Sequence, residues 1–214
     1  MKIRVILSLL VLAFLFVILL IKWNLVNDID STIGEHIYHL HDHPVSTIIS
    51  GIGMIGSTVG IISTLFLFMF ILAWLEKSFV SSVVLFFTVL FGNIANKVLK
   101  EIVARERPVF PQHIEDGYSF PSGHVMVGGL LLGMIAYNLV KRTSRKNIKQ
   151  AILTITCLLI LLIGFSRLLE GEHFVTDVIG GILAGSIMLI GMIKLDRLVH
   201  QMVKDRKLRK DAAM

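Results

Sequence analysis

Six long apolar runs recur along this chain of 214 residues, and they constrain its fold more than any other feature. A helix that crosses a bilayer needs roughly 20 largely apolar residues, and in lipid the backbone polar groups must be satisfied within helices or closed barrels. With 55% hydrophobic and 17% charged residues, the chain is too apolar for a soluble domain. We therefore predict one all-α domain over residues 1–214, a polytopic membrane protein with six transmembrane helices. The expected spans are about 5–21, 52–73, 79–98, 124–140, 151–166 and 178–195.

Basic residues are unevenly divided between the two sides that these spans define. With the N-terminus placed in the cytoplasm, most of the 21 Lys and Arg residues fall on the cytoplasmic side. Cytoplasmic loops of membrane proteins are enriched in these residues, so both termini are expected there. The loops 99–123 and 167–177 then lie on the outer face. The basic C-terminal tail favours contact with an anionic leaflet over nucleic-acid binding. No small-residue cleavage pattern follows the first span, which is therefore expected to stay uncleaved.

The segment 24–44 is polar and carries four histidines, His36, His39, His41 and His43. The favoured interpretation is a short interfacial helix that starts near Ser31. A metal site is the alternative, because His36 and His39 are three residues apart and can share a helix face. No carboxylate or cysteine framework completes such a site, so no metal is predicted. The segments 24–44 and 109–117 are the candidates for covering a site on the outer face.

Three further patterns concern packing. Gly56 and Gly60 in the second expected span predict a face on which another helix packs closely. In the third span, four polar residues follow helical spacing and predict a polar cavity near its end, namely Asn93, Asn96, Lys97 and Lys100. Cys157 lies inside an apolar run and is predicted to be a small buried residue, with no intrachain disulfide possible.

The fourth span opens with Pro121-Ser122-Gly123-His124. A helix N-terminus presents free backbone N–H groups and the positive end of the helix dipole, which suits a phosphate group. Three cations lie at the outer ends of neighbouring spans, and guanidinium groups bind phosphate oxygens through paired hydrogen bonds. We therefore predict a phosphate site. The groups expected to hold the oxygens are the Ser122 hydroxyl, the Gly123 N–H, Lys100, Arg107 and Arg167.

His173 and Asp177 are four residues apart, which places them on one face of a helix. An aspartate that accepts from one imidazole nitrogen leaves the other free as a nucleophile or base. His124 is placed to protonate a leaving group as a general acid. The cations supply the charge that phosphoryl transfer requires, so neither a metal nor another cofactor is expected.

These stretches resemble the three sequence signatures of the type 2 phosphatidic acid phosphatase superfamily. The matching residues are Lys100-x6-Arg107-Pro108, Pro121-Ser122-Gly123-His124 and Ser166-Arg167-x5-His173-x3-Asp177. That family includes lipid phosphate phosphatases, glucose-6-phosphatase and vanadium haloperoxidases. The resemblance implies that a phosphohistidine forms on His173, oriented by Asp177 and with His124 as the acid, and that water then hydrolyses it.

Within that family, the small size and the six spans are similar to bacterial phosphatidylglycerophosphatase B-type enzymes of the plasma (inner) membrane. This likeness implies hydrolysis of phosphatidylglycerophosphate to phosphatidylglycerol and phosphate, or of undecaprenyl pyrophosphate, the cell-wall carrier lipid. The expected partners are the bilayer and a lipid phosphate substrate; no nucleic acid and no obligatory protein partner are indicated. Three other hypotheses stay open: a non-catalytic lipid-phosphate binder or transporter, a vanadate-dependent haloperoxidase, and a structural bundle with an incidental motif.

Overall fold

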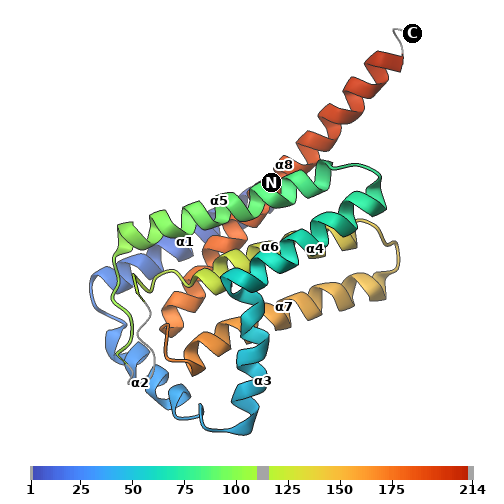
Figure 1. Cartoon of the computed structure of the whole chain (residues 1–214). Helices are drawn as coiled ribbons and strands as arrows, with labels where there is room; N and C mark the ends of the chain where they lie inside the picture. The colour runs from blue at the N-terminus through green and yellow to red at the C-terminus, as the bar shows by residue number, and fades with distance from the viewer. Residues whose placement is uncertain (1, 110–115, 212–214) are drawn as a thin grey trace.

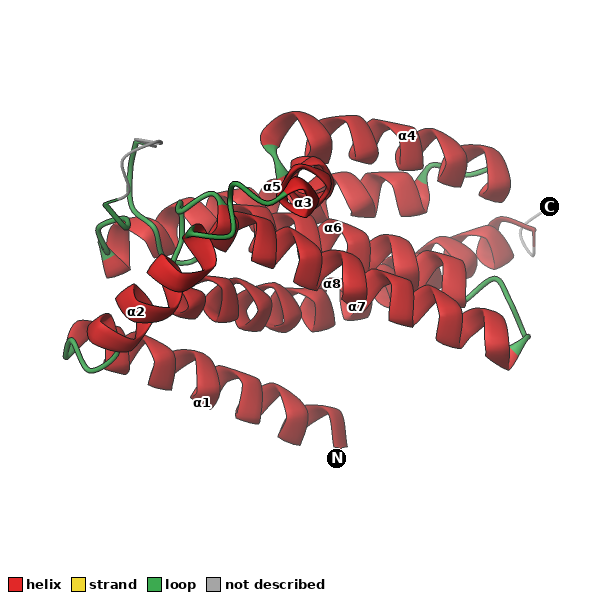
Figure 2. Cartoon of the chain, turned by 90° about the horizontal axis from the view of Figure 1, so that it is seen from below, coloured by secondary structure: helices red, strands yellow, loops and turns green. Residues whose placement is uncertain are grey.

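The computed structural model describes residues 2–109 and 116–211, and the regular secondary structure within them is entirely helical (Figure 1, Figure 2). Six of its helices are long and apolar enough to cross a membrane, which confirms the predicted all-α fold with six membrane-spanning helices. Helices α5, α7 and α8 continue beyond the expected limits, because their polar ends still satisfy the helical hydrogen-bond pattern. The six are α1 (Lys2–Lys22), α4 (Thr58–Glu76), α5 (Val80–Val103), α6 (Gly123–Val140), α7 (Lys146–Leu169) and α8 (Val175–Asp211).

Two short helices and a 3₁₀ turn connect α1 to α4: α2 (Asn27–Tyr38), α3 (Pro44–Gly53) and η1 (Met54–Gly56). The sequence predicted one helix here, starting near Ser31, and a span that began at residue 52. The break after η1 has a local cause. Ser57 has extended backbone, and its hydroxyl accepts from the Gly60 N–H at 3.1 Å, which caps α4. The predicted second span therefore begins in the last residues of α3 and continues in α4, and these two helices run in different directions (Figure 1).

Two packing predictions need correction. Gly56 does allow another helix to approach closely, because a Cβ on it would lie 3.0 Å from the His124 carbonyl of α6. Gly60 does not share that face: it follows the cap at Ser57, and a Cβ on it would lie 2.0 Å from the Met54 carbonyl. Cys157 is exposed on the surface of α7 rather than buried. Lipid tails are as apolar as a protein core, so an apolar run in a membrane helix does not imply protein neighbours.

Helix α6 lies at the centre of the bundle, where it packs against α5, α7 and α8. Its buried side chains include Met126, Leu130 and Met134. Two glycines of α8 allow the segment just before α6 to approach closely. A Cβ on Gly180 would lie 2.3 Å from the Phe120 ring, and one on Gly181 would lie 2.9 Å from the Ser122 carbonyl. The chain that leads into α6 therefore rests directly on α8.

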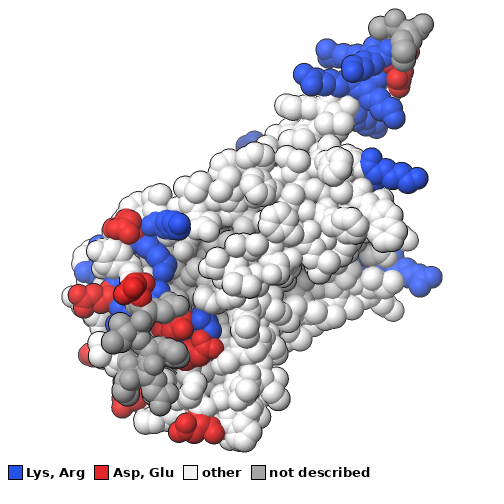
Figure 3. All heavy atoms as spheres, in the orientation of Figure 1, with Lys and Arg blue, Asp and Glu red and all other residues white. Residues whose placement is uncertain are grey.

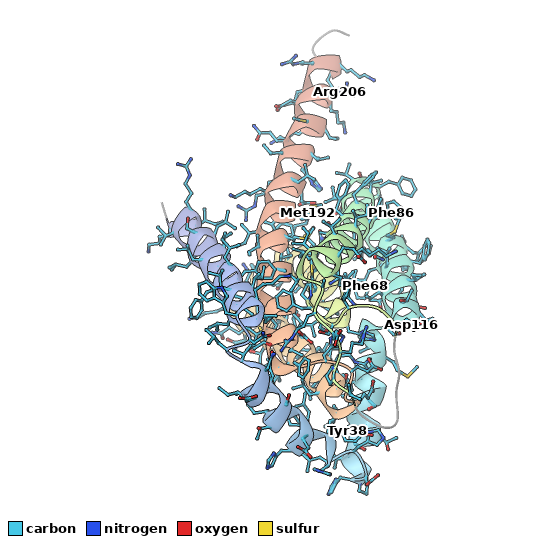
Figure 4. The ribbon with its side chains drawn as sticks, turned by 90° about the vertical axis from the view of Figure 1, so that its left-hand side faces the viewer. Tyr38, Phe68, Phe86, Asp116, Met192 and Arg206 are labelled. Atoms are coloured by element: carbon cyan, nitrogen blue, oxygen red, sulfur yellow. The ribbon has the colours of Figure 1, made fainter. Side chains whose placement is uncertain are left out.

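The bundle has two chemically different ends. Helix α8 has 37 residues, or about 55 Å at 1.5 Å per residue, well beyond a hydrocarbon core of about 30 Å. Arg206 lies on the part of α8 that projects past the bundle, and Tyr38 lies at the opposite end (Figure 4). Lys and Arg gather on the projecting end, both signs of charge gather at the other end, and the visible face between them is uncharged (Figure 3).

Candidate functional site

A cavity of about 270 Å³ lies between α4, α5 and α6 at the end of the bundle away from the α8 projection. Asn93 and Asn96 line it, as the polar face of the third span predicted, whereas Lys97 is exposed elsewhere. Three predicted site residues are buried outside the lining: Ser122, Arg167 and Asp177. Five predicted site residues form part of its wall: Lys100, Arg107, Gly123, His124 and His173.

The start of α6 forms one side of the cavity. The helix begins at Gly123, as the Ser-Gly pair predicted, with Ser122 as the preceding non-helical residue. The Ser122 N–H donates to the Asp177 carbonyl at 3.1 Å, and Asn96 Nδ2 donates to the Pro121 carbonyl at 3.1 Å. These bonds fix the helix start against α8 and α5. The Ser122 hydroxyl is buried and has no hydrogen-bond partner within the described residues, which is unusual for a buried polar group.

His173 and Asp177 lie side by side, as predicted, but they do not share a helix face. His173 precedes α8, which begins at Val175. Asp177 Oδ2 instead accepts from the Phe174 N–H at 2.9 Å, and this bond folds the preceding residue back over the carboxylate. His173 Nδ1 lies 3.5 Å from Asp177 Oδ2, longer than a hydrogen bond. Contacts between functional side chains in ligand-free active sites are often this long and shorten when a ligand binds.

The surroundings of His173 keep its imidazole neutral. Burial lowers the pKa of His173 below the ordinary histidine value, because a low-dielectric site disfavours the charged ring. Asp177 opposes that effect, while the cations Arg107 and Lys100 add to it. A neutral imidazole has the lone pair that a nucleophile or base needs.

Arg167 is held by carboxylates, which the sequence did not predict. One of its amino groups donates to Glu172 Oε2 at 2.5 Å and to His124 Nε2 at 3.2 Å. The other donates to Glu170. Arg167 therefore adjoins His124 but is already occupied by anionic oxygens of the connector between α7 and α8. Any further oxyanion at this guanidinium competes with these carboxylate oxygens.

Arg107 is oriented by backbone carbonyls. Its Nε donates to the Gly117 carbonyl at 3.1 Å, and one amino group donates to the Glu172 carbonyl at 3.0 Å. Two such bonds from a planar guanidinium fix its plane at the cavity wall. Arg107 also links the loop before α6 to the connector before α8, so it joins two of the three motif segments.

Sequence reasoning missed Arg105 and Asp30. Arg105 donates to Asp177 Oδ1 at 2.8 Å and to Asp30 Oδ2 at 2.7 Å, and all three side chains are buried. The only available signal was that Arg105 stands two residues before Arg107. Nothing in the sequence distinguished Asp30 from Asp28, which is exposed on the same helix.

The four histidines of segment 24–44 lie away from the cavity lining. Examples are His36, which contacts the Thr32 carbonyl through Nδ1 at 2.7 Å, and His43, which caps α3. Within residues 2–109 and 116–211, no group of three or more His, Cys, Asp or Glu side chains is placed to hold a metal ion. Of the two expected covering segments, 109–117 falls largely outside the described residues, and 24–44 touches the site through Asp30.

Comparison with known proteins shows similarity in sequence to a protein family and to a bacterial enzyme. The family described as the PAP2 superfamily matches residues 81–201. Phosphatidylglycerophosphatase B of Bacillus subtilis (strain 168) is 42% identical over 108 residues, which are 49% of this chain and 53% of that protein. The chain thus spans about half the length of this curated relative.

Two solved structures are similar to this fold over most of the chain. The first transmembrane PAP2 type phosphatidylglycerolphosphate phosphatase from Bacillus subtilis superposes with a TM-score of 0.83 at 28% identity, over 89% of this chain and 96% of that one. Aquifex aeolicus LpxE superposes with a TM-score of 0.57 at 22% identity, over 78% and 95% of the two chains. At that identity the second likeness concerns the fold alone.

Proposed function

The chain belongs to the PAP2 superfamily, and on that premise we propose that it is a membrane phosphatase that removes the terminal phosphate of a lipid. One observation carries the proposal. The cavity wall combines a buried histidine backed by a carboxylate, a second histidine and two cations, namely His173, His124, Lys100 and Arg107. This set matches the needs of phosphoryl transfer, in which positioning and charge stabilisation do most of the catalytic work.

In the first step, Nε2 of His173 attacks phosphorus while the bond from phosphorus to the lipid oxygen breaks. The departing oxygen takes a proton from His124. Lys100, Arg107 and the Gly123 N–H hold the non-bridging oxygens, and Asp177 stabilises the positive charge that develops on the ring. Ser122 and Arg167, which adjoin the cavity, complete the set once phosphate oxygens replace the glutamates on Arg167.

In the second step, water attacks the phosphohistidine. His124, which lost its proton in the first step, takes one from this water as it adds to phosphorus. The bond between nitrogen and phosphorus breaks, which releases inorganic phosphate and returns His173 to its neutral form. The donors are side chains and backbone groups of this chain, so we expect turnover to withstand removal of divalent metal ions.

The walls of the cavity favour sideways entry of a lipid. Beyond the polar residues, the lining continues onto α4 and α5 with Ile61, Ile62 and Val89, and Ile62 is exposed on the surface. An apolar wall of this kind accommodates the first carbons of an acyl or prenyl chain while the phosphate lies among the cations. The head group therefore enters between α4 and α5.

We place the cavity on the outer face of a bacterial plasma membrane. The support is the basic projecting end of α8 (Figure 3), because Lys and Arg mark the cytoplasmic side. We propose phosphatidylglycerophosphate as the first candidate substrate, on the likeness to the Bacillus subtilis phosphatase. An outward cavity also suits undecaprenyl pyrophosphate, which needs no transfer from the inner leaflet.

The test is phosphate release by the purified full chain in detergent with excess EDTA. Phosphatidylglycerophosphate, phosphatidic acid and undecaprenyl pyrophosphate are offered side by side, with His173→Ala as the control. We expect release that resists EDTA and disappears in the variant, and the order of rates assigns the substrate. A folded protein that releases phosphate from none of the three would instead support a lipid-phosphate binder or transporter.

A further inference from the structure

Arg105 forms a buried bridge between two carboxylates that come from distant parts of the chain. One amino group donates to Asp177 Oδ1 at 2.8 Å, and the other donates to Asp30 Oδ2 at 2.7 Å. The Arg105 side chain is 7% exposed, and those of Asp30 and Asp177 are 2% and 0% exposed. A buried charge is tolerated only when it is paired, so these three groups stabilise one another.

The bridge divides the two oxygens of Asp177 between two tasks. Oδ1 accepts from Arg105, whereas Oδ2 accepts from the Phe174 N–H and faces His173 Nδ1 at 3.5 Å. With Oδ1 held, the carboxylate plane is fixed and Oδ2 stays directed at the imidazole. Two carboxylates and one guanidinium also leave one negative charge in the cluster, next to the ring that becomes positive in the proposed reaction.

Asp30 also anchors the start of α8. Its Oδ1 accepts from the Thr176 N–H at 3.2 Å, one of the N–H groups that a helix leaves unpaired at its N-terminus. The Thr176 hydroxyl donates to Asp30 as well, and Arg105 donates to that hydroxyl at 2.6 Å. The guanidinium lies over the Phe174 ring at 4.2 Å. Asp30 of α2 therefore contacts the turn next to His173 directly at Thr176. Through Arg105 it is also linked to Phe174 and Asp177, the two ends of that turn.

Arg105 and Arg107 serve different sides of the same segment. Arg107 lines the cavity and is held by the Gly117 and Glu172 carbonyls, whereas Arg105 does not line the cavity and contacts Asp177 from behind. The first therefore faces the substrate phosphate, and the second acts on the reaction only through another residue.

We propose that Arg105 and Asp30 are positioning residues that orient Asp177, and through it His173, for the phosphatase reaction. The proposal rests on the proposed function for its kinetic consequence. Its structural consequence is separate: the bridge favours the His173 tautomer with the proton on Nδ1, directed at Asp177. An isosteric Asp30→Asn change removes the charge that holds Arg105, and Arg105→Lys keeps the charge but loses the fork that spans two carboxylates.

The kinetic test compares Asp30→Asn and Arg105→Lys with Asp28→Asn, a matched control on the exposed side of α2. We expect the first two to lower kcat about 10- to 100-fold, by analogy with the loss of a partner that orients a metal-bound histidine. KM should be nearly unchanged because no phosphate contact is lost. Asp28→Asn should behave as wild type. If Arg105→Lys instead raised KM and weakened the binding of inorganic phosphate by the same factor, Arg105 would be a phosphate ligand and the proposal would be overturned. A wild-type kcat in Asp30→Asn would overturn it as well.

A measurement without substrate separates this proposal from the proposed function. In protein labelled with ¹⁵N-histidine, the His173 signals are identified by their absence in His173→Ala, and their shifts report which ring nitrogen is protonated. We expect mostly Nδ1–H in the wild type and in Asp28→Asn, and a mixture in Asp30→Asn. If the latter variant does not fold, Thr176→Val, which loses one hydroxyl of the same cluster, should shift the tautomer ratio in the same direction. An unchanged ratio in each folded variant contradicts the proposal, whether or not the wild type hydrolyses lipids.

Discussion

His173 is both the proposed nucleophile and the most buried histidine near the cavity. Its burial therefore affects the lowest pH at which the proposed nucleophile is still neutral. Burial, Arg107 and Lys100 lower its pKa, so acidification protonates the ring only below the ordinary value of about 6.5. Neutral His173 should therefore persist, and support turnover, into mildly acidic solution. The direct measurement is an NMR titration of His173 in the ligand-free protein; a midpoint above 6.5 would contradict this expectation.

The same titration tests the influence of Asp177. Asp177 is the group that raises the pKa of His173 against the effect of burial. In Asp177→Asn, which removes the charge but keeps the shape, we expect the His173 midpoint to move to lower pH than in the wild type. An unchanged midpoint would mean that the 3.5 Å approach of the two side chains does not persist in solution.

Catalysis gives a second prediction for Asp177. Asp177→Asn should lower kcat by about 10²- to 10⁴-fold, because an amide neither fixes the imidazole tautomer nor stabilises its positive charge. The variant should still fold, since Arg105 keeps its ion pair with Asp30. Turnover in detergent and the thermal midpoint of unfolding measure the two effects. A rate within a few-fold of wild type would remove Asp177 from the mechanism.

Single residues also show what the sequence can predict about a site. Five predicted residues share one cavity, because each lies at or within a few residues of the end of a helix that its apolar run identifies: Lys100, Arg107, Gly123, His124 and His173. The partners of Arg167 were not predicted. Which of several nearby carboxylates an arginine contacts depends on side-chain rotamers in a folded connector, and spacing along the chain carries no such information.

At the scale of helices, α3 supports the site from outside the membrane-spanning set. A Cβ on Gly53 would lie 2.1 Å from Ser166 Oγ, next to Arg167, whereas one on Gly51 would meet nothing within 4 Å. Gly53→Ala should push α3 away from α7, destabilise the protein by about 1–3 kcal/mol as overpacking does, and lower activity by displacing Arg167. Gly51→Ala should be neutral or slightly stabilising, because alanine favours a helix.

Thermal unfolding and lipid phosphate release, measured on both alanine variants, test this contact. The pair differs only in which side of α3 receives one methyl group, so loss of helix flexibility is common to both. Equal behaviour of the two variants would show that α3 does not pack on α7 as described.

Helix α3 is an element that the sequence did not predict as a separate helix. Hydropathy identifies the six spans because lipid exposure requires continuous apolar surface. It did not reveal that the apolar residues on either side of Ser57 belong to different helices, because α3 is apolar as well. The separation depends on one hydroxyl that caps α4, a local signal that hydropathy averages away.

At the scale of the whole molecule, the distribution of charge predicts the orientation in the membrane. In a Cys157→Ser background, Asp116→Cys lies near the cavity end and Arg206→Cys on the projecting end of α8 (Figure 4). A membrane-impermeant thiol reagent applied to intact spheroplasts should label the first directly and the second only after permeabilisation. The opposite pattern would place the cavity in the cytoplasm and remove the argument for an outer-leaflet substrate.

Helix α8 runs without interruption from Asp177 in the buried cluster to Asp211 beyond the bundle. A protein of 23.9 kDa with little mass outside the bilayer offers few features for aligning particle images in electron microscopy. A helical soluble domain joined in register after Asp211 would continue the same rod and so hold a fixed angle to the bundle. Such a domain would serve as an alignment marker at the end of the bundle opposite the cavity.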